Sequence, residues 1–79
     1  MKKIECFNGT PRTKSGLPIP VMARYRWGKF TVNCRIHDGL YFVTWHNGKQ
    51  TARTWYSADK EAMNDIVRTY LKDGYKREL

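Results

Sequence analysis

The sequence predicts an α+β fold, a three- to four-stranded antiparallel β-meander with one C-terminal α-helix packed on one face. Two hairpin-turn dipeptides, Asp38-Gly39 and Asn47-Gly48, are each flanked by β-branched and aromatic residues. When strand pairing is counted from each turn independently, both turns agree on which side of the sheet is apolar. Helical apolar periodicity follows the last strand, and a helix of that kind needs an apolar face to cover.

The two turns predict the pairing of strands over residues 29–37, 40–46 and 49–56. Counted from Asp38-Gly39, Cys34 lies opposite Val43. Counted from Asn47-Gly48, Val43 lies opposite Ala52. Directly opposed residues share a face of the sheet. The predicted apolar face holds Phe30, Val32, Cys34, Ile36, Tyr41, Val43, Trp45, Ala52 and Tyr56, with Gln50 and Thr54 as polar members. The predicted solvated face holds Thr31, Asn33, Arg35, His37, Leu40, Phe42, Thr44, His46, Lys49, Thr51, Arg53 and Trp55.

A first strand is expected over residues 21–26, where apolar and basic residues alternate. A tight reversal at Trp27-Gly28 would place Tyr25 opposite Phe30 and extend the apolar face. Tryptophan is strained at a turn position with positive φ. We therefore expect a longer loop or a bulge at this reversal.

The helix is predicted over residues 58–73, capped by Ser57 at its start and by Gly74 at its end. Asp59 and Glu61 fall in its first turn, where the helix dipole favours acids. The residues that recur at helical spacing form one apolar stripe. They are Ala62, Met63, Ile66, Val67, Tyr70 and Leu71.

Seventy-nine residues make one domain with a small core. We expect a basic, poorly ordered N-terminal arm over residues 1–20, the sheet-plus-helix domain over 21–74, and a short charged tail over 75–79. Within the arm, Ile4, Cys6 and Phe7 are compatible with a short edge strand.

The chain has no apolar run long enough for a membrane helix, and its basic start lacks the apolar segment expected of a secretory signal, so we expect none there. Two cysteines do not make a disulfide framework. Cys34 is predicted to point into the core, and Cys6 lies in a different region. We therefore expect two free thiols and a cytoplasmic location, associated with the nucleoid if the protein binds DNA.

The net charge of +8 is concentrated in one part of the chain. Residues 1–57 carry ten Lys and Arg against Glu5 and Asp38, whereas residues 58–79 carry five bases and five acids. This asymmetry predicts a polyanionic partner, nucleic acid above all.

The solvated face is the predicted contact surface because it combines bases, short polar residues and aromatics without an acid. Arg35 and Arg53, central in the sheet, are expected to read bases, while Arg24, Arg26 and Lys49 hold phosphates. The residues predicted to contact nucleic acid are Arg24, Arg26, Trp27, Lys29, Asn33, Arg35, Phe42, Thr44, Lys49, Thr51, Arg53 and Trp55.

No catalytic or metal-binding pattern is predicted. The histidines and cysteines fit no zinc-finger or ribbon spacing, and Cys34 and His37 should point to opposite faces. The acids cluster on the helix and the histidines on the sheet, and no glycine-rich phosphate loop precedes the helix. We expect no enzyme activity, no cofactor and no small-molecule substrate.

Two segments resemble a known family. Arg26 to Gly39, RWGKFTVNCRIHDG, is similar to the strand region of the ethylene-response-factor (APETALA-type) DNA-binding domain. Gly48 to Val67, GKQTARTWYSADKEAMNDIV, resembles its last strand and the start of its helix. The N-terminal arm-binding domains of phage and transposon integrases share this plan. One departure is the full strand Leu40 to His46 between the matched parts.

The resemblance implies a sheet that lies in the major groove of duplex DNA, with the helix packed behind it. It also implies a small phage or mobile-element accessory factor that contacts DNA through Arg24, Arg26, Arg35 and Arg53, and through Trp27 or Trp55.

Two alternatives remain open. In the first, a small phage-type protein binds and modulates a host protein through Phe42, Leu40 and Trp55 on the same face. In the second, the face binds RNA or a single strand. Salt dependence of binding distinguishes the nucleic-acid hypotheses from the protein-docking hypothesis.

Overall fold

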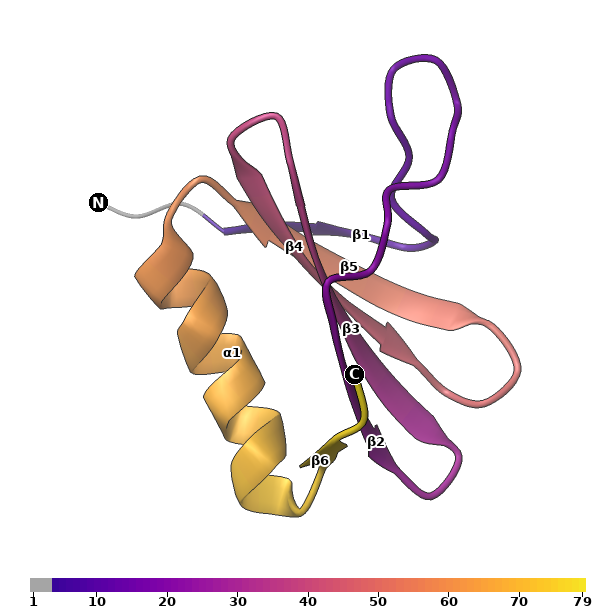
Figure 1. Ribbon diagram of the computed structural model, residues 1–79, viewed down its shortest axis with the longest axis vertical. Helices are drawn as coiled ribbons and strands as arrows, with labels where there is room; N and C mark the ends of the chain where they lie inside the picture. The colour runs from indigo at the N-terminus through magenta and orange to yellow at the C-terminus, as the bar shows by residue number, and fades with distance from the viewer. Residues whose placement is uncertain (1–3) are drawn as a thin grey trace.

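The computed structural model describes residues 4–79, in which six antiparallel strands form one sheet with a single helix on one side (Figure 1). The sheet order is β1-β5-β4-β3-β2-β6. The α+β class is confirmed, but the predicted three to four strands are too few, because β1 and β6 add at the two edges. We call the side that the helix covers the helix face and the opposite side the outer face. The elements are β1 Glu5–Phe7, β2 Ala23–Trp27, β3 Phe30–His37, β4 Leu40–His46, β5 Thr51–Ser57, α1 Lys60–Asp73 and β6 Lys76–Arg77.

The β3–β4 hairpin has the predicted register. Asp38 and Gly39 have φ values of 51° and 76°. Two successive positive φ values are the requirement of a type I′ turn, which matches the twist of the strands beside it. Cys34 accordingly lies opposite Val43, as predicted, with both on the helix face.

The β2–β3 connection is a two-residue turn, so the longer loop or bulge expected there is wrong, and the turn lies one residue further along the chain than Trp27-Gly28. Trp27 pairs with Phe30, so the turn residues are Gly28 and Lys29, and Gly28 supplies the positive φ of 60°. The predicted pairing of Tyr25 with Phe30 is therefore wrong by two residues, and Tyr25 lies opposite Val32. Since a shift of two residues preserves the side-chain alternation, the predicted faces of β2 remain correct.

The β4–β5 pairing is wrong by three residues, and this turns β5 over. Within Asn47-Gly48 only the glycine has positive φ, at 95°. The Asn47 side-chain oxygen instead accepts the backbone N–H groups of Lys49 and Gln50 at 3.0 and 3.1 Å, so the loop spans four residues. Thr44 then pairs with Thr54 instead of Thr51.

An odd shift moves every side chain of a strand to the other face. Thr54 and Tyr56, predicted for the core, lie opposite outer-face residues of β4, whereas Arg53 and Trp55 lie on the helix face. The register changes again between Trp45 and His46, so Ala52 has no partner on β4. Gln50 belongs to the loop.

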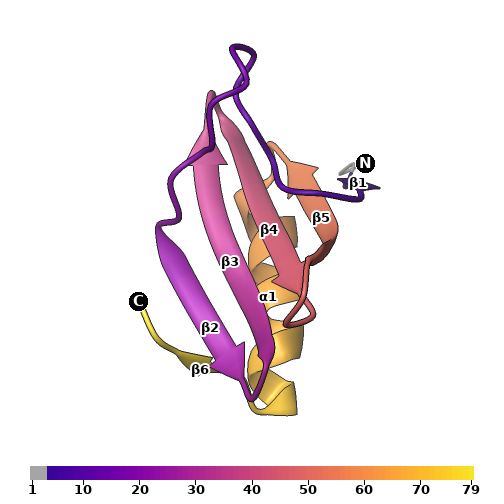
Figure 2. The same cartoon turned by 90° about the vertical axis from the view of Figure 1, so that its right-hand side faces the viewer.

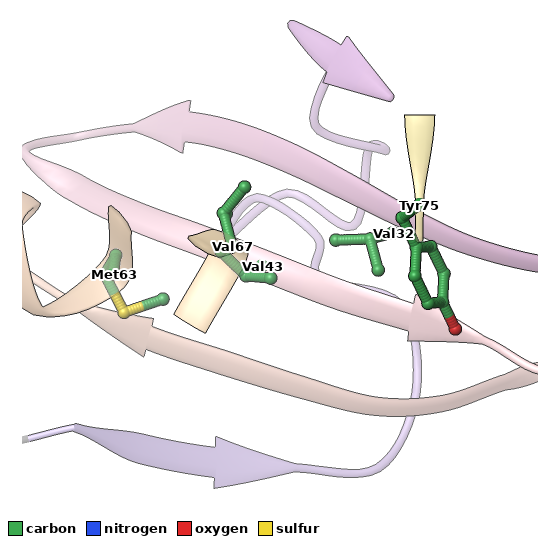
Figure 3. Packing of buried hydrophobic residues seen from close by; sticks show 5 residues of the cluster. All are labelled: Val32, Val43, Met63, Val67 and Tyr75. Atoms are coloured by element: carbon green, nitrogen blue, oxygen red, sulfur yellow. The ribbon is translucent and has the colours of Figure 1, made fainter. Parts of the chain in front are cut away.

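The core lies between the helix face and α1. The close-up in Figure 3 shows its fully packed members, Val32, Val43, Met63, Val67 and Tyr75. Half-buried hydrophobic residues surround them. These are Tyr25, Phe30, Cys34, Tyr41, Trp45, Trp55, Ile66 and Tyr70.

The helix is capped two residues later than predicted. Asp59, not Ser57, is the N-cap residue, and its carboxylate accepts the backbone N–H of Ala62 at 3.2 Å. Ser57 instead accepts the N–H of Asp59 at 3.0 Å and so shapes the turn before the helix. Gly74 ends the helix in the left-handed conformation, as predicted, with φ of 113°.

The last residues form part of the fold, where the sequence predicted only a charged tail. The Tyr75 ring is buried, and its hydroxyl accepts the indole N–H of Trp45 at 3.0 Å. β6 pairs with β2, placing Arg77 opposite Tyr25.

Residues 8–22 link β1 to β2 and lie over the outer face, which was predicted to be solvated. Figure 2 views the sheet from this side, with α1 behind the strands and the linking segment in front of them. Pro11 and Ile19 are buried within this segment. Residues 1–20 were expected to be a poorly ordered arm. The described part of this arm contains the predicted edge strand β1 and makes these contacts, while residues 1–3 lie outside the described range.

Candidate nucleic-acid interface

Beneath the linking segment, a chain of hydrogen bonds crosses β3, β4 and β5 on the outer face. Arg35 donates from Nε to the Ile19 carbonyl at 2.9 Å and from Nη1 to the Thr44 hydroxyl at 3.1 Å. The hydroxyls of Thr44 and Thr54 are 3.1 Å apart, and Thr54 donates to the Gly9 carbonyl at 2.6 Å. A hydroxyl has one hydrogen, which Thr54 gives to Gly9. Thr44 must therefore donate to Thr54, so the donors run in one direction from Arg35 to Gly9.

This arrangement covers the residue that was expected to read bases from the centre of the sheet. Arg35 is 9% exposed, and its guanidinium is committed to protein oxygens. Burial, followed by the positive charge of Arg24, lowers the pKa of Arg35 below its ordinary range. In this conformation Arg35 supports the linking segment and does not offer a contact surface.

The aromatic patch expected on the outer face is not formed. Phe42 is buried and stacks on Tyr56 with ring centroids 5.8 Å apart. Trp55 lies on the helix face, where its ring is 6.3 Å from that of Tyr70. The prediction that Phe42, Leu40 and Trp55 form one docking surface is therefore wrong, because β5 turns its other face and Trp55 lies on the opposite side of the sheet from Phe42.

Four other predicted contact residues also lie away from an open outer face. Thr44 is buried in the hydrogen-bonded chain, and the Thr51 hydroxyl bonds that of Thr10 in the linking segment at 2.9 Å. Arg53 is exposed but lies opposite Trp45 on the helix face. Trp27 also lies on the helix face, 53% exposed, with its ring 5.8 Å from that of Tyr75.

The remaining predicted residues gather on and beside the half of the outer face nearest the β2–β3 and β4–β5 turns. Arg24 lies opposite Asn33, and Arg26 lies opposite Thr31, which in turn faces His46 across β3 and β4. Lys29 and Lys49 lie on the two turns that border these rows, and the Lys29 ammonium lies 5.5 Å from the centroid of the Phe30 ring, which belongs to the helix face. We call this surface the basic strip, and it comprises Arg24, Arg26, Lys29, Asn33, His46 and Lys49.

The two arginines of the basic strip are oriented by neighbours. Asn33 Oδ1 accepts from Arg24 Nε at 3.0 Å, which holds the guanidinium against the sheet. Arg26 forms an ion pair with Glu78 at 2.8 Å, with both side chains about half exposed. An ion pair this exposed is weak, so a phosphate can compete for Arg26.

The two turns of the basic strip touch each other. A Cβ added at Gly48 would lie 3.1 Å from both the Cβ and the backbone oxygen of Lys29, so any side chain here would push the two turns a few tenths of an ångström apart. The packing brings the turns that carry Lys29 and Lys49 to the same end of the sheet.

His46 was placed on this face by its alternation but was not among the predicted contacts. Its Nδ1 accepts the Gly48 N–H at 3.1 Å, so Nε2 carries the proton of the neutral ring and is a hydrogen-bond donor. A histidine two residues before a hairpin glycine was the available signal in the sequence.

Within residues 4–79, no three His, Cys, Asp or Glu side chains gather closely enough to hold a metal ion. Over the same range, no helix combines the length and the apolar character needed to cross a membrane. Cys6 and Cys34 are both free, as expected, although Cys34 is only half-buried.

We compared the chain with protein-family models, with curated proteins and with solved structures, and none of the three comparisons finds a match.

Proposed function

We propose that this protein binds nucleic acid through the basic strip, with duplex DNA as the preferred form. The observation that carries the proposal is the gathering of Arg24, Arg26, Lys29 and Lys49 beside the hydrogen-bonding groups of Asn33 and His46. The net charge of +8 supplies a long-range attraction to a polyanion.

The placement of the acids supports the choice of this surface. Glu5 accepts a hydrogen bond from Tyr56 at the opposite edge of the sheet, and Asp38 lies at the opposite end of β3. Among the described residues, Glu78 is the carboxylate that an ion pair brings to the basic strip. A phosphate backbone therefore meets cations and neutral donors along the rest of the strip.

The expected contacts are mainly to phosphates. Alternate residues on a strand are about 7 Å apart, so Arg24 and Arg26 present two cations along one edge of the strip. Lys29 and Lys49 continue the charge around the turns. Asn33 Nδ2 and His46 Nε2 are the donors that suit base edges, because Asn33 Oδ1 and His46 Nδ1 already accept hydrogen bonds within the protein.

The test is fluorescence anisotropy with a labelled random-sequence duplex, repeated between about 50 and 200 mM salt. Three or four phosphate contacts predict a slope of log K against log salt of about −3. The double variant Arg24→Ala/Arg26→Ala should weaken binding to every duplex sequence and reduce the magnitude of the slope by about two units.

The matched control is Arg68→Ala/Lys72→Ala, which removes the same charge from exposed positions on the helix. Equal losses of duplex affinity in the two double variants would show that the net charge attracts DNA without a defined contact surface, and the proposal would be wrong. Competition with single-stranded DNA and with RNA decides which form is preferred. If a single strand competes more strongly than the duplex, the preferred ligand of the basic strip is a single strand and not duplex DNA.

A further inference from the structure

A cavity of about 130 Å³ opens between the first half of α1 and the end of β3, on the helix face. The helix packs against β4 and β5, which leaves the neighbouring part of β3 uncovered. β2 begins at Ala23, opposite Cys34, so Ile36 lies beyond the end of that strand. Met22, Ile36, Tyr41, Val43, Met63 and Val67 supply apolar side chains to the lining.

The size of the cavity limits what can enter it. An engineered apolar cavity of about 150 Å³ holds one benzene molecule, so this cavity accommodates a single ring or one branched aliphatic group. The apolar surface also extends outside the cavity, because Met22 is 54% and Ile36 46% exposed. A small molecule inside would leave this rim uncovered, whereas a polypeptide would cover the rim and place one side chain inside.

The charges around the cavity indicate the character of that polypeptide. Lys60 lies between Asp59 and Glu61 at the first turn of α1, and of these three residues only Lys60 lines the cavity, which has no Asp or Glu in its lining. Two flexible methionines, Met22 and Met63, allow the lining to adapt to different side chains.

We propose that this cavity binds an aromatic or branched aliphatic side chain from an acidic segment of a partner protein. The side chain fills the cavity, its neighbours pack on Met22 and Ile36, and a carboxylate of the segment pairs with Lys60. This site is distinct from the basic strip, which lies on the opposite face of the sheet.

The probe is a short acetylated peptide of Glu and Ala with one central Phe, titrated into the full chain at about 0.15 M salt, where long-range attraction is screened. Methyl NMR signals of Met22, Met63 and Val43 report the footprint. A peptide with Ala in place of Phe should bind about tenfold more weakly, since the anchor supplies the buried apolar contact. Equal affinity for the two peptides would overturn the proposal.

Two sets of variants separate the site from general charge attraction. Met22→Lys and Ile36→Lys, at exposed positions, should each abolish the difference between the two peptides, whereas Leu17→Lys, at an exposed apolar residue elsewhere, should preserve it. Lys60→Gln should weaken the Phe peptide about threefold, and Lys72→Gln at the other end of α1 should not. Retention of the difference between the two peptides in both Met22→Lys and Ile36→Lys would refute the site.

Free phenylacetate distinguishes a small-molecule ligand from a protein ligand. Weaker binding of phenylacetate than of the peptide, with the same methyl footprint, supports the proposal. Phenylacetate binding without peptide binding would assign the cavity to a small carboxylate and overturn it. The cavity variants leave the residues of the basic strip unchanged, so we expect them to keep their affinity for duplex DNA. Failure of one proposal is therefore distinguishable from failure of the other.

Discussion

Replacing Thr44 by valine tests the buried hydrogen-bonded chain on the outer face. Valine keeps the shape of threonine but removes the hydroxyl, which accepts from Arg35 at 3.1 Å and donates to Thr54 at 3.1 Å. A hydrogen bond to a charged group contributes about 1.5–3 kcal/mol, and one between neutral groups about 0.5–1.5 kcal/mol. We therefore expect Thr44→Val to lower the free energy of unfolding by about 2–4 kcal/mol.

The assay is urea denaturation followed by tryptophan fluorescence, with an unchanged m-value as evidence that both states keep their compactness. Thr44→Ser is the matched control, because it keeps the hydroxyl and removes one methyl, at a cost of about 1 kcal/mol. Thr54→Val should cost less than Thr44→Val, since it leaves the charged donor of Arg35 paired. A loss below about 0.5 kcal/mol in Thr44→Val would refute the reasoning and show that Arg35 is not held by this hydroxyl.

Three further predictions concern the thiols, a turn glycine and the helix cap. A thiol reagent at about pH 8 should label exposed Cys6 quickly and Cys34 slowly, because burial raises the pKa of Cys34 to about 11. Above pH 9 the Cys34 thiol of the unfolded chain ionises at its ordinary pKa of 9.0, while the folded thiol stays protonated up to about pH 11. The free energy of unfolding should therefore fall between about pH 9 and 11, by up to 1.4 kcal/mol per pH unit. This fall should be smaller in Cys34→Ala. Gly48→Ala should destabilise by more than Gly16→Ala in thermal unfolding, since both glycines have positive φ but only Gly48 has neighbouring atoms at 3.1 Å; equal losses would contradict the close approach of the turns. Asp59→Ala should cost about 1 kcal/mol in urea denaturation and Asp59→Asn much less, and an unaffected Ala variant would show that the carboxylate does not cap the helix.

The central hairpin could be predicted because the dipeptide Asp38-Gly39 was compatible with one turn conformation. Asp38-Gly39 places both residues at positive φ, and the register of β3 and β4 follows from it. Asn47-Gly48 had two readings, because asparagine can either adopt positive φ or accept backbone N–H groups through its side chain. The second reading lengthens the loop. The adjacent aromatics Trp55 and Tyr56 gave β5 no clear alternation to correct the register.

The candidate site was predictable only where the register was correct. Arg24, Arg26 and Asn33 lie on the expected face because the error in the β2 register was even. The covering of the outer face depends on Ile19 and Gly9, whose contacts with Arg35 and Thr54 span 16 and 45 positions of the chain and leave no periodic signal. Such contacts depend on tertiary packing and not on local sequence pattern.

The shortness of the two edge strands has a consequence for self-association. β1 has three residues and β6 two, so the intact sheet offers another chain only a short row of unpaired backbone groups. Glu5 and Tyr56 are 51 positions apart, so pairing β1 with β5 closes a long loop and is entropically costly. Release of β1 would uncover β5, a seven-residue strand with no acid and with adjacent aromatics at its end. Resistance to aggregation in this protein therefore depends on how firmly its first strand stays docked.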